Sequence, residues 1–222
     1  MSMLLMAAKD DSRNLLNKYV KEHVWHFEQP DGWGQSKPDA VGSESLTASG
    51  YGGADDGICG TQGLLWGSTE SGCPNTTLVW PSYSCTSLWS YITAGSGKVN
   101  LTLGQSASWK ASYTYLLLNF GSLASSISCG YSYNIWHNFC VVSNYSAAHV
   151  LDIWLYMDAN LIWSSTSVDM SATPRGTGIV LGGMNTAEDE LAILSSSTAF
   201  TSTTAQALAT ALFRTKSWIV LT

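Results

Sequence analysis

Aromatic side chains are the most frequent candidates for chemistry in this sequence, which contains ten tryptophans and ten tyrosines among 222 residues. An indole or phenol offers a flat apolar face with a polar edge, which stacks on sugar rings and anchors protein interfaces. Trp154, Tyr156 and Trp163 fall in one stretch of alternating residues, and Trp33 stands between two glycines, as expected at a loop tip. These four are our candidate stacking residues, and burial in a core is the alternative for each of them.

Acidic side chains give a second candidate chemistry in Glu188-Asp189-Glu190. Alternate residues of a strand share a face, so Glu188 and Glu190 would lie together. Two carboxylates about 5 Å apart are the machinery of a retaining glycosidase. No further carboxylate follows in this stretch, where positions 192 and 193 are Ala and Ile. We therefore expect a structural or solvated role for the two glutamates.

Thiols are the third candidate, because the chain has five cysteines. Cys129 and Cys140 would face each other if Asn134-Ile135 formed the turn of a hairpin, so a cross-strand disulfide is one prediction and buried thiols are the other. Zinc is not indicated, since no Cys-x-x-Cys pair exists.

The elements that must position these residues are strands. Charged residues make up only 12% of the chain, and Gly, Ser, Thr, Trp and Tyr take their place, which favours an all-β protein. From Leu151 to Met157 every second residue is apolar, as in a strand with one face in a core. We expect strands near 24–28, 113–119, 127–133, 136–142, 150–157, 161–168 and 189–195, a helix near 204–213 and a loop at 50–57.

The amino terminus has a different character from the rest. Asp10-Asp11-Ser12 is typical of a helix start, and the helix is expected to run to about Glu22. Residues 1–8 are apolar but too short to span a bilayer, and they lack the features of a secretory signal. We divide the chain into a helical segment at 1–21, for packing or attachment, and a β-sandwich domain at 22–222.

The net charge of -6 limits the partners, because the ten basic residues are scattered along the chain. Such a chain offers no stripe of positive charge for phosphates, so we expect neither nucleic acid nor an anionic membrane surface as a partner.

Several segments taken in order carry a resemblance to a known family. Trp136-His137 opens an apolar strand, Leu155-Tyr156-Met157-Asp158 ends another, and Asp189-Glu190 opens a third. A helical stretch then closes on Leu212-Phe213. Over roughly residues 22–214 this succession resembles a laminin G-like domain of the concanavalin A-like lectin/glucanase superfamily. The chain departs from the family pattern after Asp158, where Ala159 stands in place of the usual glycine.

The resemblance implies a two-sheet antiparallel jelly-roll sandwich with a short C-terminal helix, to which the residues at 10–22 add the short N-terminal helix. It also implies recognition of a glycan or a cell-surface receptor. Glucanases of the superfamily carry Glu-x-Asp-x-x-Glu on one strand, and this chain lacks the last carboxylate, so we expect no enzyme activity. No cofactor is required. Some members bind calcium through loop carboxylates, and solvated loop residues are the alternative reading of the four aspartates that could serve here: Asp55, Asp56, Asp158 and Asp169.

The function expected from these features is non-catalytic binding by a surface-displayed structural protein. Such domains occur in phage fibres, decoration proteins and capsid surfaces, so the predicted location is a virion or particle surface, with assembly as a homo-oligomer or with other structural proteins. A free-standing lectin or adhesin is the first alternative, located in the cytoplasm or exported by a non-classical route. A glucanase-type glycoside hydrolase is the second. Membrane insertion is not expected.

Overall fold

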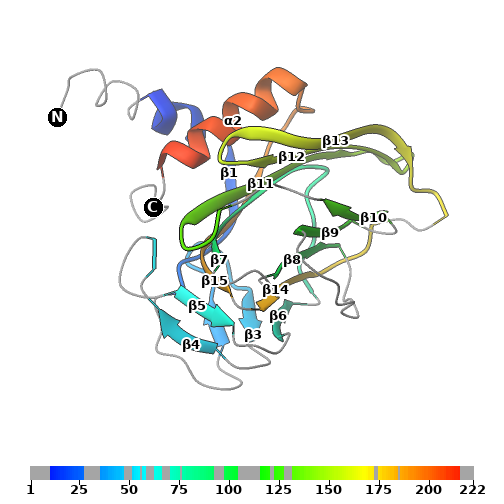
Figure 1. The fold of residues 1–222 in the computed structure, drawn as a ribbon. Coiled ribbons are helices and arrows are strands. Elements are labelled where there is room, and N and C mark those ends of the chain that lie inside the picture. Colours follow the sequence, from blue (N-terminus) through cyan, green and yellow to red (C-terminus); the bar gives the residue numbers. More distant parts are fainter. Residues whose placement is uncertain are drawn as a thin grey trace.

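The computed structural model describes these parts of the chain: residues 11–27, 36–47, 52–55, 57–58, 63–66, 71–75, 77–92, 98–104, 116–120, 123–127, 132–172, 175–184 and 186–215. Two sheets face each other in this part, and a helix lies on the outer side of the larger one (Figure 1). The predicted two-sheet sandwich is confirmed.

The larger sheet contains eight of the described strands. Its order runs from β13 at one edge through β12, β11, β7, β15 and β5 to β4, and β1 also pairs with β15. The pairing is antiparallel throughout. The bounds are β1 (Val20–Trp25), β4 (Gly52–Asp55), β5 (Gly63–Trp66), β7 (Tyr83–Ile92), β11 (Trp136–Tyr145), β12 (Val150–Met157), β13 (Asn160–Asp169) and β15 (Thr186–Ser195).

The smaller sheet contains five of the described strands, in the order β10, β9, β8, β14, β6. Its β8 and β9 run parallel, which departs from the antiparallel rule of the other pairs. The bounds are β6 (Ser71–Asn75), β8 (Lys98–Leu103), β9 (Leu116–Phe120), β10 (Leu123–Ile127) and β14 (Ile179–Met184). A separate pair is formed by β2 (Ser36–Pro38) and β3 (Ser45–Thr47).

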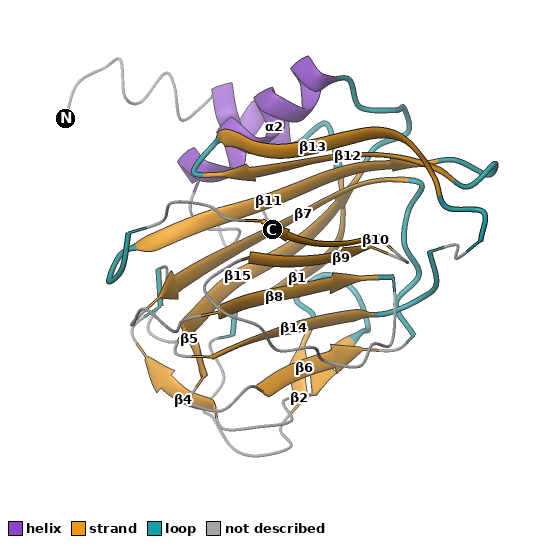
Figure 2. Ribbon diagram, turned by 45° about the vertical axis from the view of Figure 1, so that its right-hand side comes forward, coloured by secondary structure: helices purple, strands orange, loops and turns teal. Residues whose placement is uncertain are grey.

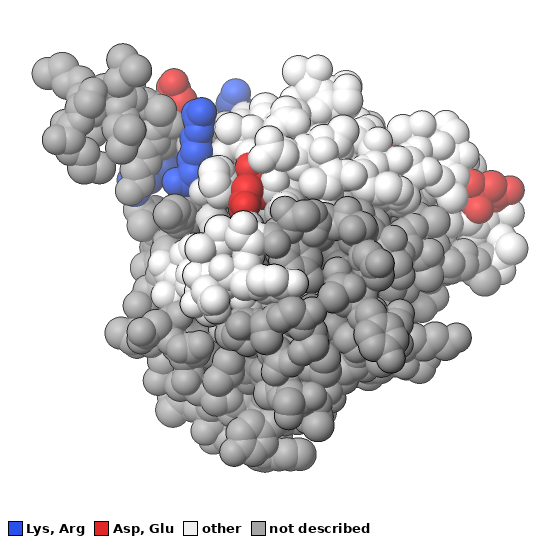
Figure 3. Space-filling view, in the orientation of Figure 1, with Lys and Arg blue, Asp and Glu red and all other residues white. Residues whose placement is uncertain are grey.

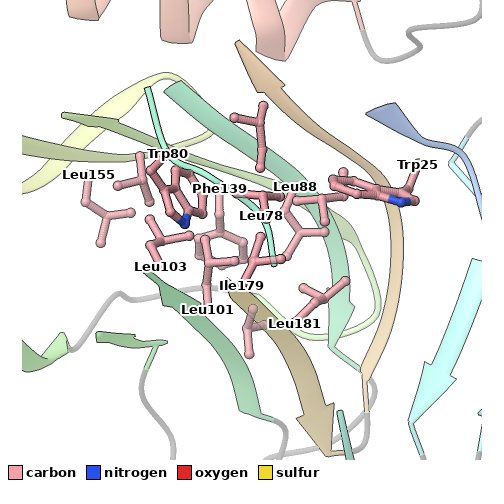
Figure 4. Close-up of a cluster of buried hydrophobic side chains, with 14 of the residues drawn as sticks. Trp25, Leu78, Trp80, Leu88, Leu101, Leu103, Phe139, Leu155, Ile179 and Leu181 are labelled. Atoms are coloured by element: carbon pink, nitrogen blue, oxygen red, sulfur yellow. The ribbon is translucent and has the colours of Figure 1, made fainter. Parts of the chain in front are cut away.

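The main core lies between the two sheets. The larger sheet contributes one face of its central strands, including Leu88, Phe139 and Leu155, and β8 and β14 contribute Leu101 and Leu181. Figure 4 shows Trp25 at one end of this core and Trp80 toward the side of Leu155. Burial of aliphatic and aromatic side chains at about 25 cal/mol per Å² is the dominant stabilisation of such a sandwich.

A second core lies on the outer face of the larger sheet, beneath α2 (Ser202–Thr215). Thr201 caps this helix, because the Thr204 amide donates to its hydroxyl at 3.2 Å. The helix buries one stripe of side chains on the sheet: Ala205, Leu208, Ala209, Ala211 and Leu212. Figure 2 shows α2 above β11, β12 and β13, and Leu16 of the helical segment at 11–16 joins the same cluster. The expected C-terminal helix is confirmed.

Two expectations about local structure were wrong. The amino-terminal helix ends at Leu16, and Val20 already begins β1, because this stretch pairs with β15. The strand therefore crosses the boundary that we drew at residue 21. Part of the glycine-rich stretch at 50–57 is strand β4, held by pairing with β5. Of the strand expected at 127–133, Ile127 is the last residue of β10 and Tyr133 begins a turn, while residues 128–131 lie outside the described part.

Among the described residues, no helix is both long and apolar enough to cross a membrane.

Candidate functional site

The β12–β13 hairpin does not expose the aromatic face that the sequence suggested. The alternation itself was correct, since Leu151, Ile153 and Leu155 all enter the core between the sheets. The opposite face is not free, however, because Trp154 and Tyr156 are packed beneath α2 and are only 7% and 1% exposed. Their role as stacking residues is therefore wrong. Trp33 lies outside the described residues.

Trp163 faces the other way from Trp154. It stands opposite Leu155 in the β12–β13 register, whereas Trp154 stands opposite Ser164. Trp163 is half-buried and packs against the edge of the main core. Four other half-buried side chains pack against that core with it, and we call the five together the β13 strip: Tyr145, Met157, Ile162, Trp163 and Val168.

Three members of the strip, Ile162, Trp163 and Val168, lie at the edge of the larger sheet because β13 is its outermost strand, whereas Met157 and Tyr145 are the last residues of β12 and β11. An edge strand has a neighbour on one side only, so its side chains receive less cover than those of β11 or β12. The strip ends at Tyr145, which stands opposite Leu151, and Leu151 in turn stands opposite Val168. Leu151 itself is completely buried, so Val168 and Tyr145 lie on either side of a core residue, on the same face of the sheet as Trp163.

A basic residue, Arg175, lies beside Tyr145 of this strip. The Arg175 guanidinium carbon lies 4.7 Å from the Tyr145 ring centre and 5.9 Å from that of Trp80. Its Nη2 donates to the carbonyl oxygens of Trp80 at 3.2 Å and Pro81 at 3.0 Å. Burial lowers the pKa of the guanidinium to about 10, so Arg175 stays a cation at neutral pH.

Further hydrogen bonds fix this arrangement, which we call the Arg175 cluster: Trp80, Tyr145, His149 and Arg175. The backbone amide of Arg175 donates to the Tyr145 hydroxyl at 3.0 Å, and that hydroxyl lies 2.8 Å from Nδ1 of His149. The Trp80 indole donates to the carbonyl of Gly178 at 2.7 Å. Gly104, with a φ of 77°, leaves the space that Arg175 fills, since a Cβ there would collide with the Arg175 side chain.

Sequence reasoning missed the Arg175 cluster. Trp80, Tyr145 and Arg175 are far apart in the chain, and no member belongs to a motif. The one available signal was a basic residue in a chain that has only ten, placed between Pro174 and Gly176. The Arg175 guanidinium is a partly buried cation stacked on two aromatic rings, and the Arg175 amide and the Trp80 indole already donate to protein oxygens. The exposed part of such a cation can attract hydroxyl-rich or anionic ligands.

The acidic strand is enclosed. Glu188, Asp189 and Glu190 are each 0% exposed. The Ile58 amide donates to the Asp189 carboxylate at 3.0 Å, and Nδ1 of His26 lies 3.1 Å from the Glu190 carboxylate. Glu190 has a φ of 53° beside a bulge between β15 and β7. Carboxylates with no exposed surface cannot touch a polysaccharide, so the arrangement favours the structural role that we expected.

Two of the four aspartates considered for calcium, Asp158 and Asp169, do not come together. Asp158 is at the turn between β12 and β13, whereas Asp169 is at the far end of β13, roughly 30 Å away along a strand of this length. Asp158 is bound to His137 at 2.6 Å and to the Asn138 amide at 2.9 Å, and Asp169 accepts the Ser171 amide at 2.8 Å. The Asp55 side chain and Asp56 are outside the described part. Within that part, no three His, Cys, Asp or Glu side chains are grouped as a metal would require.

The hairpin proposed to join Cys129 and Cys140 is not formed. Both edges of β11 at Cys140 are occupied, by β7 on one side and β12 on the other, so no further strand can pair with it there. Cys140 is a free, buried thiol whose sulfur lies 3.4 Å from that of Cys85. Cys129 lies outside the described residues.

Comparison with known proteins adds information on the fold. No protein-family model matches the sequence, and no curated protein matches it. Among solved structures, the chain is similar to domain 4 of AbnA, a GH43 extracellular arabinanase from Geobacillus stearothermophilus, in complex with arabinotriose. Identity is 15%, coverage is 86% of this chain and 99% of that one, and the TM-score is 0.55.

Botulinum neurotoxin binding domains are also similar. The serotype D domain in complex with N-acetylneuraminic acid is 12% identical over 89% of this chain, with a TM-score of 0.56. The DC domain in complex with rat synaptotagmin II is 11% identical over 90% of this chain, with a TM-score of 0.59. This chain spans about half of those domains, 52% in both cases. The comparisons support a β-sandwich of the kind found in carbohydrate-binding domains, and laminin G-like domains are not singled out among its neighbours.

Proposed function

We propose that this chain is a non-catalytic carbohydrate-binding domain whose ligand lies on the β13 strip and reaches the Arg175 cluster. The observation that carries the proposal is the half-buried Trp163 on the edge strand β13, on the same face of the larger sheet as Tyr145, which stacks with Arg175. An indole held in this way keeps part of its flat face for a sugar ring. The match covers 99% of the arabinanase domain, whose structure contains arabinotriose, and this likeness supports a carbohydrate as the ligand.

The surface around this edge agrees with an uncharged ligand. In Figure 3, most of the described surface over α2, β12 and β13 carries neither acidic nor basic side chains. A neutral sugar binds through stacking and hydrogen bonds and does not depend on a charged stripe. The cation of Arg175 would then select among ligands, with a carboxylate-bearing sugar as the case that gains most from it.

The absence of catalysis is part of the proposal. The candidate nucleophile and acid would be Glu188 and Glu190, and both are enclosed. Display on a viral or phage particle stays a prediction, as do self-assembly and the assembly with other structural proteins. A protein receptor is an outcome that the test below can also reveal.

The test compares two substitutions on opposite faces of β13. Trp163→Ala removes the indole of the strip, whereas Leu161→Ala removes an apolar side chain that is 50% exposed and stands opposite Tyr156, on the helix side. A glycan array identifies ligands of the wild-type chain, with arabino-oligosaccharides and sialylated glycans included. Calorimetric titration and thermal melts then follow for both variants.

We expect Trp163→Ala to weaken binding about fivefold or more, because a stacking contact is worth ~1 kcal/mol. Leu161→Ala should bind as the wild type does. Equal affinity of the two variants would contradict the site, and no binding to any glycan would contradict the function. Release of reducing sugar from a polysaccharide, abolished by Glu190→Gln, would contradict the non-catalytic assignment.

A further inference from the structure

Two cysteines come together in the middle of the larger sheet. Cys85 is on β7 and Cys140 is on the neighbouring β11, 55 positions later in the chain. Cys85 stands opposite Val142, and Cys140 stands opposite Ser87, so the two cysteines are diagonal partners on the same face. Their sulfur atoms are 3.4 Å apart.

The pair lies in the second core, beneath α2. Both side chains are completely buried, and they share this cluster with Tyr156, which stands opposite Cys140 on β12. Burial, and then the neighbouring Cys140, raise the pKa of the Cys85 thiol well above its ordinary value. A thiol is nucleophilic only as a thiolate, so the pair is protected from reaction once the domain has folded.

We propose that Cys85 and Cys140 form a disulfide when the chain folds in the presence of a low-molecular-weight disulfide, and that the closed bond ties β7 to β11. The first protein thiolate attacks the oxidant and displaces one of its thiols. The second protein thiolate then attacks the mixed disulfide and displaces the other thiol. One oxidant S–S bond is broken and one protein S–S bond is formed, and the two protons of the protein thiols go to the two released thiols.

The pairing of β7 with β11 brings Cys85 and Cys140 side by side. A disulfide has a sulfur–sulfur distance of about 2 Å, so the two sulfur atoms must approach each other by little more than about 1 Å. Because diagonal partners lie farther apart than directly opposite ones, this takes a local shift of the backbone as well as side-chain rotation. The strands that carry them are already fixed by hydrogen bonds along the whole of β7 and β11. The closed loop is long, and cross-links that close long loops restrict the unfolded chain most.

The experiment refolds the full chain from the reduced, denatured state in two buffers. One contains reduced and oxidised glutathione, and the other contains excess reduced thiol. Remaining thiols are blocked with iodoacetamide in denaturant, and the disulfides are mapped by proteolysis and mass spectrometry without reduction. Thermal melts are recorded for both preparations, and for Cys140→Ala and Cys129→Ala chains treated in the same way.

We expect a Cys85–Cys140 linked peptide in the glutathione sample and a melting temperature roughly 5–15 °C above that of the reduced sample. Cys129→Ala should keep this difference, and Cys140→Ala should lose it. The wild-type map decides the case even where Cys140→Ala does not fold. Alkylated Cys85 and Cys140 in the glutathione sample would overturn the proposal, and so would a Cys129–Cys140 peptide.

Discussion

The two faces of the β12–β13 hairpin show how differently the same kind of residue is used. Trp154 and Trp163 are both tryptophans of one hairpin, and both were candidates for stacking on a ligand. Trp154 is buried under α2, whereas Trp163 is partly exposed at the sheet edge. The difference arises because α2 packs over the face that carries Trp154. The face that carries Trp163 packs on the smaller sheet, which leaves the edge strand β13 partly exposed. The side-chain pattern fixes which residues share a face, but the cover of that face comes from segments far away in the chain.

The largest effect expected from this comparison is on stability. Trp154→Ala should lower the free energy of unfolding by ~3–5 kcal/mol, because the indole fills the core beneath α2 and its removal leaves a cavity. Trp163→Ala should cost clearly less, since its indole is only partly buried. Urea denaturation followed by circular dichroism measures both. Equal losses would mean that the two faces are covered alike.

A second substitution pair tests the alternation within β12. Ile153→Ala should cost ~2–5 kcal/mol, because Ile153 is completely buried between the sheets. Asp152 lies on the other face, where its carboxylate accepts the Ser167 amide at 2.8 Å. Asp152→Ala should therefore cost about 1 kcal/mol, the value of one such hydrogen bond. If denaturant melts give the same loss for both, the two residues do not lie on opposite faces.

The turn that joins the two strands gives a pH-dependent effect. The hydrogen bond that the His137 ring donates to the Asp158 carboxylate raises the pKa of His137 above its ordinary value of 6.5. A raised pKa in the folded state contributes stability that is complete below the unfolded pKa and disappears as the pH rises through the folded pKa. Asp158→Asn should therefore destabilise the protein more at about pH 6 than at about pH 8.5. Chemical denaturation at both pH values checks this, and an equal difference at the two would contradict it.

The smallest effect concerns Ala159, which follows Asp158 in the same turn. Both residues have positive φ, 50° for Asp158 and 66° for Ala159. A residue with a Cβ is strained there, and glycine is not. Ala159→Gly should raise the free energy of unfolding by ~1 kcal/mol, in line with the left-handed penalty of alanine. A melting temperature that falls would show that Ala159 makes contacts worth more than the strain.

Much of the fold followed from local patterns. The alternation in β12 placed Leu151, Ile153 and Leu155 correctly, and the apolar stripe of α2 was visible as a helix. The site followed less well. Tyr145, Trp80 and Arg175 come from segments separated by tens of residues, and no spacing in the sequence connects them. The glycine-rich β4 was missed because its strand conformation depends on pairing with β5 and not on its own residues.

The sequence by itself determined that the chain folds into strands, which of their side chains alternate, and that aromatic rings are abundant enough to form both a core and a binding surface. These properties are local, because they depend on residue type and on the two-residue repeat of a strand. Only the tertiary structure decided which aromatic rings remain accessible, which thiols meet and which carboxylates are enclosed. Those outcomes depend on what packs over each face, and the covering segments, α2 and the smaller sheet, are brought there by the fold of the whole chain.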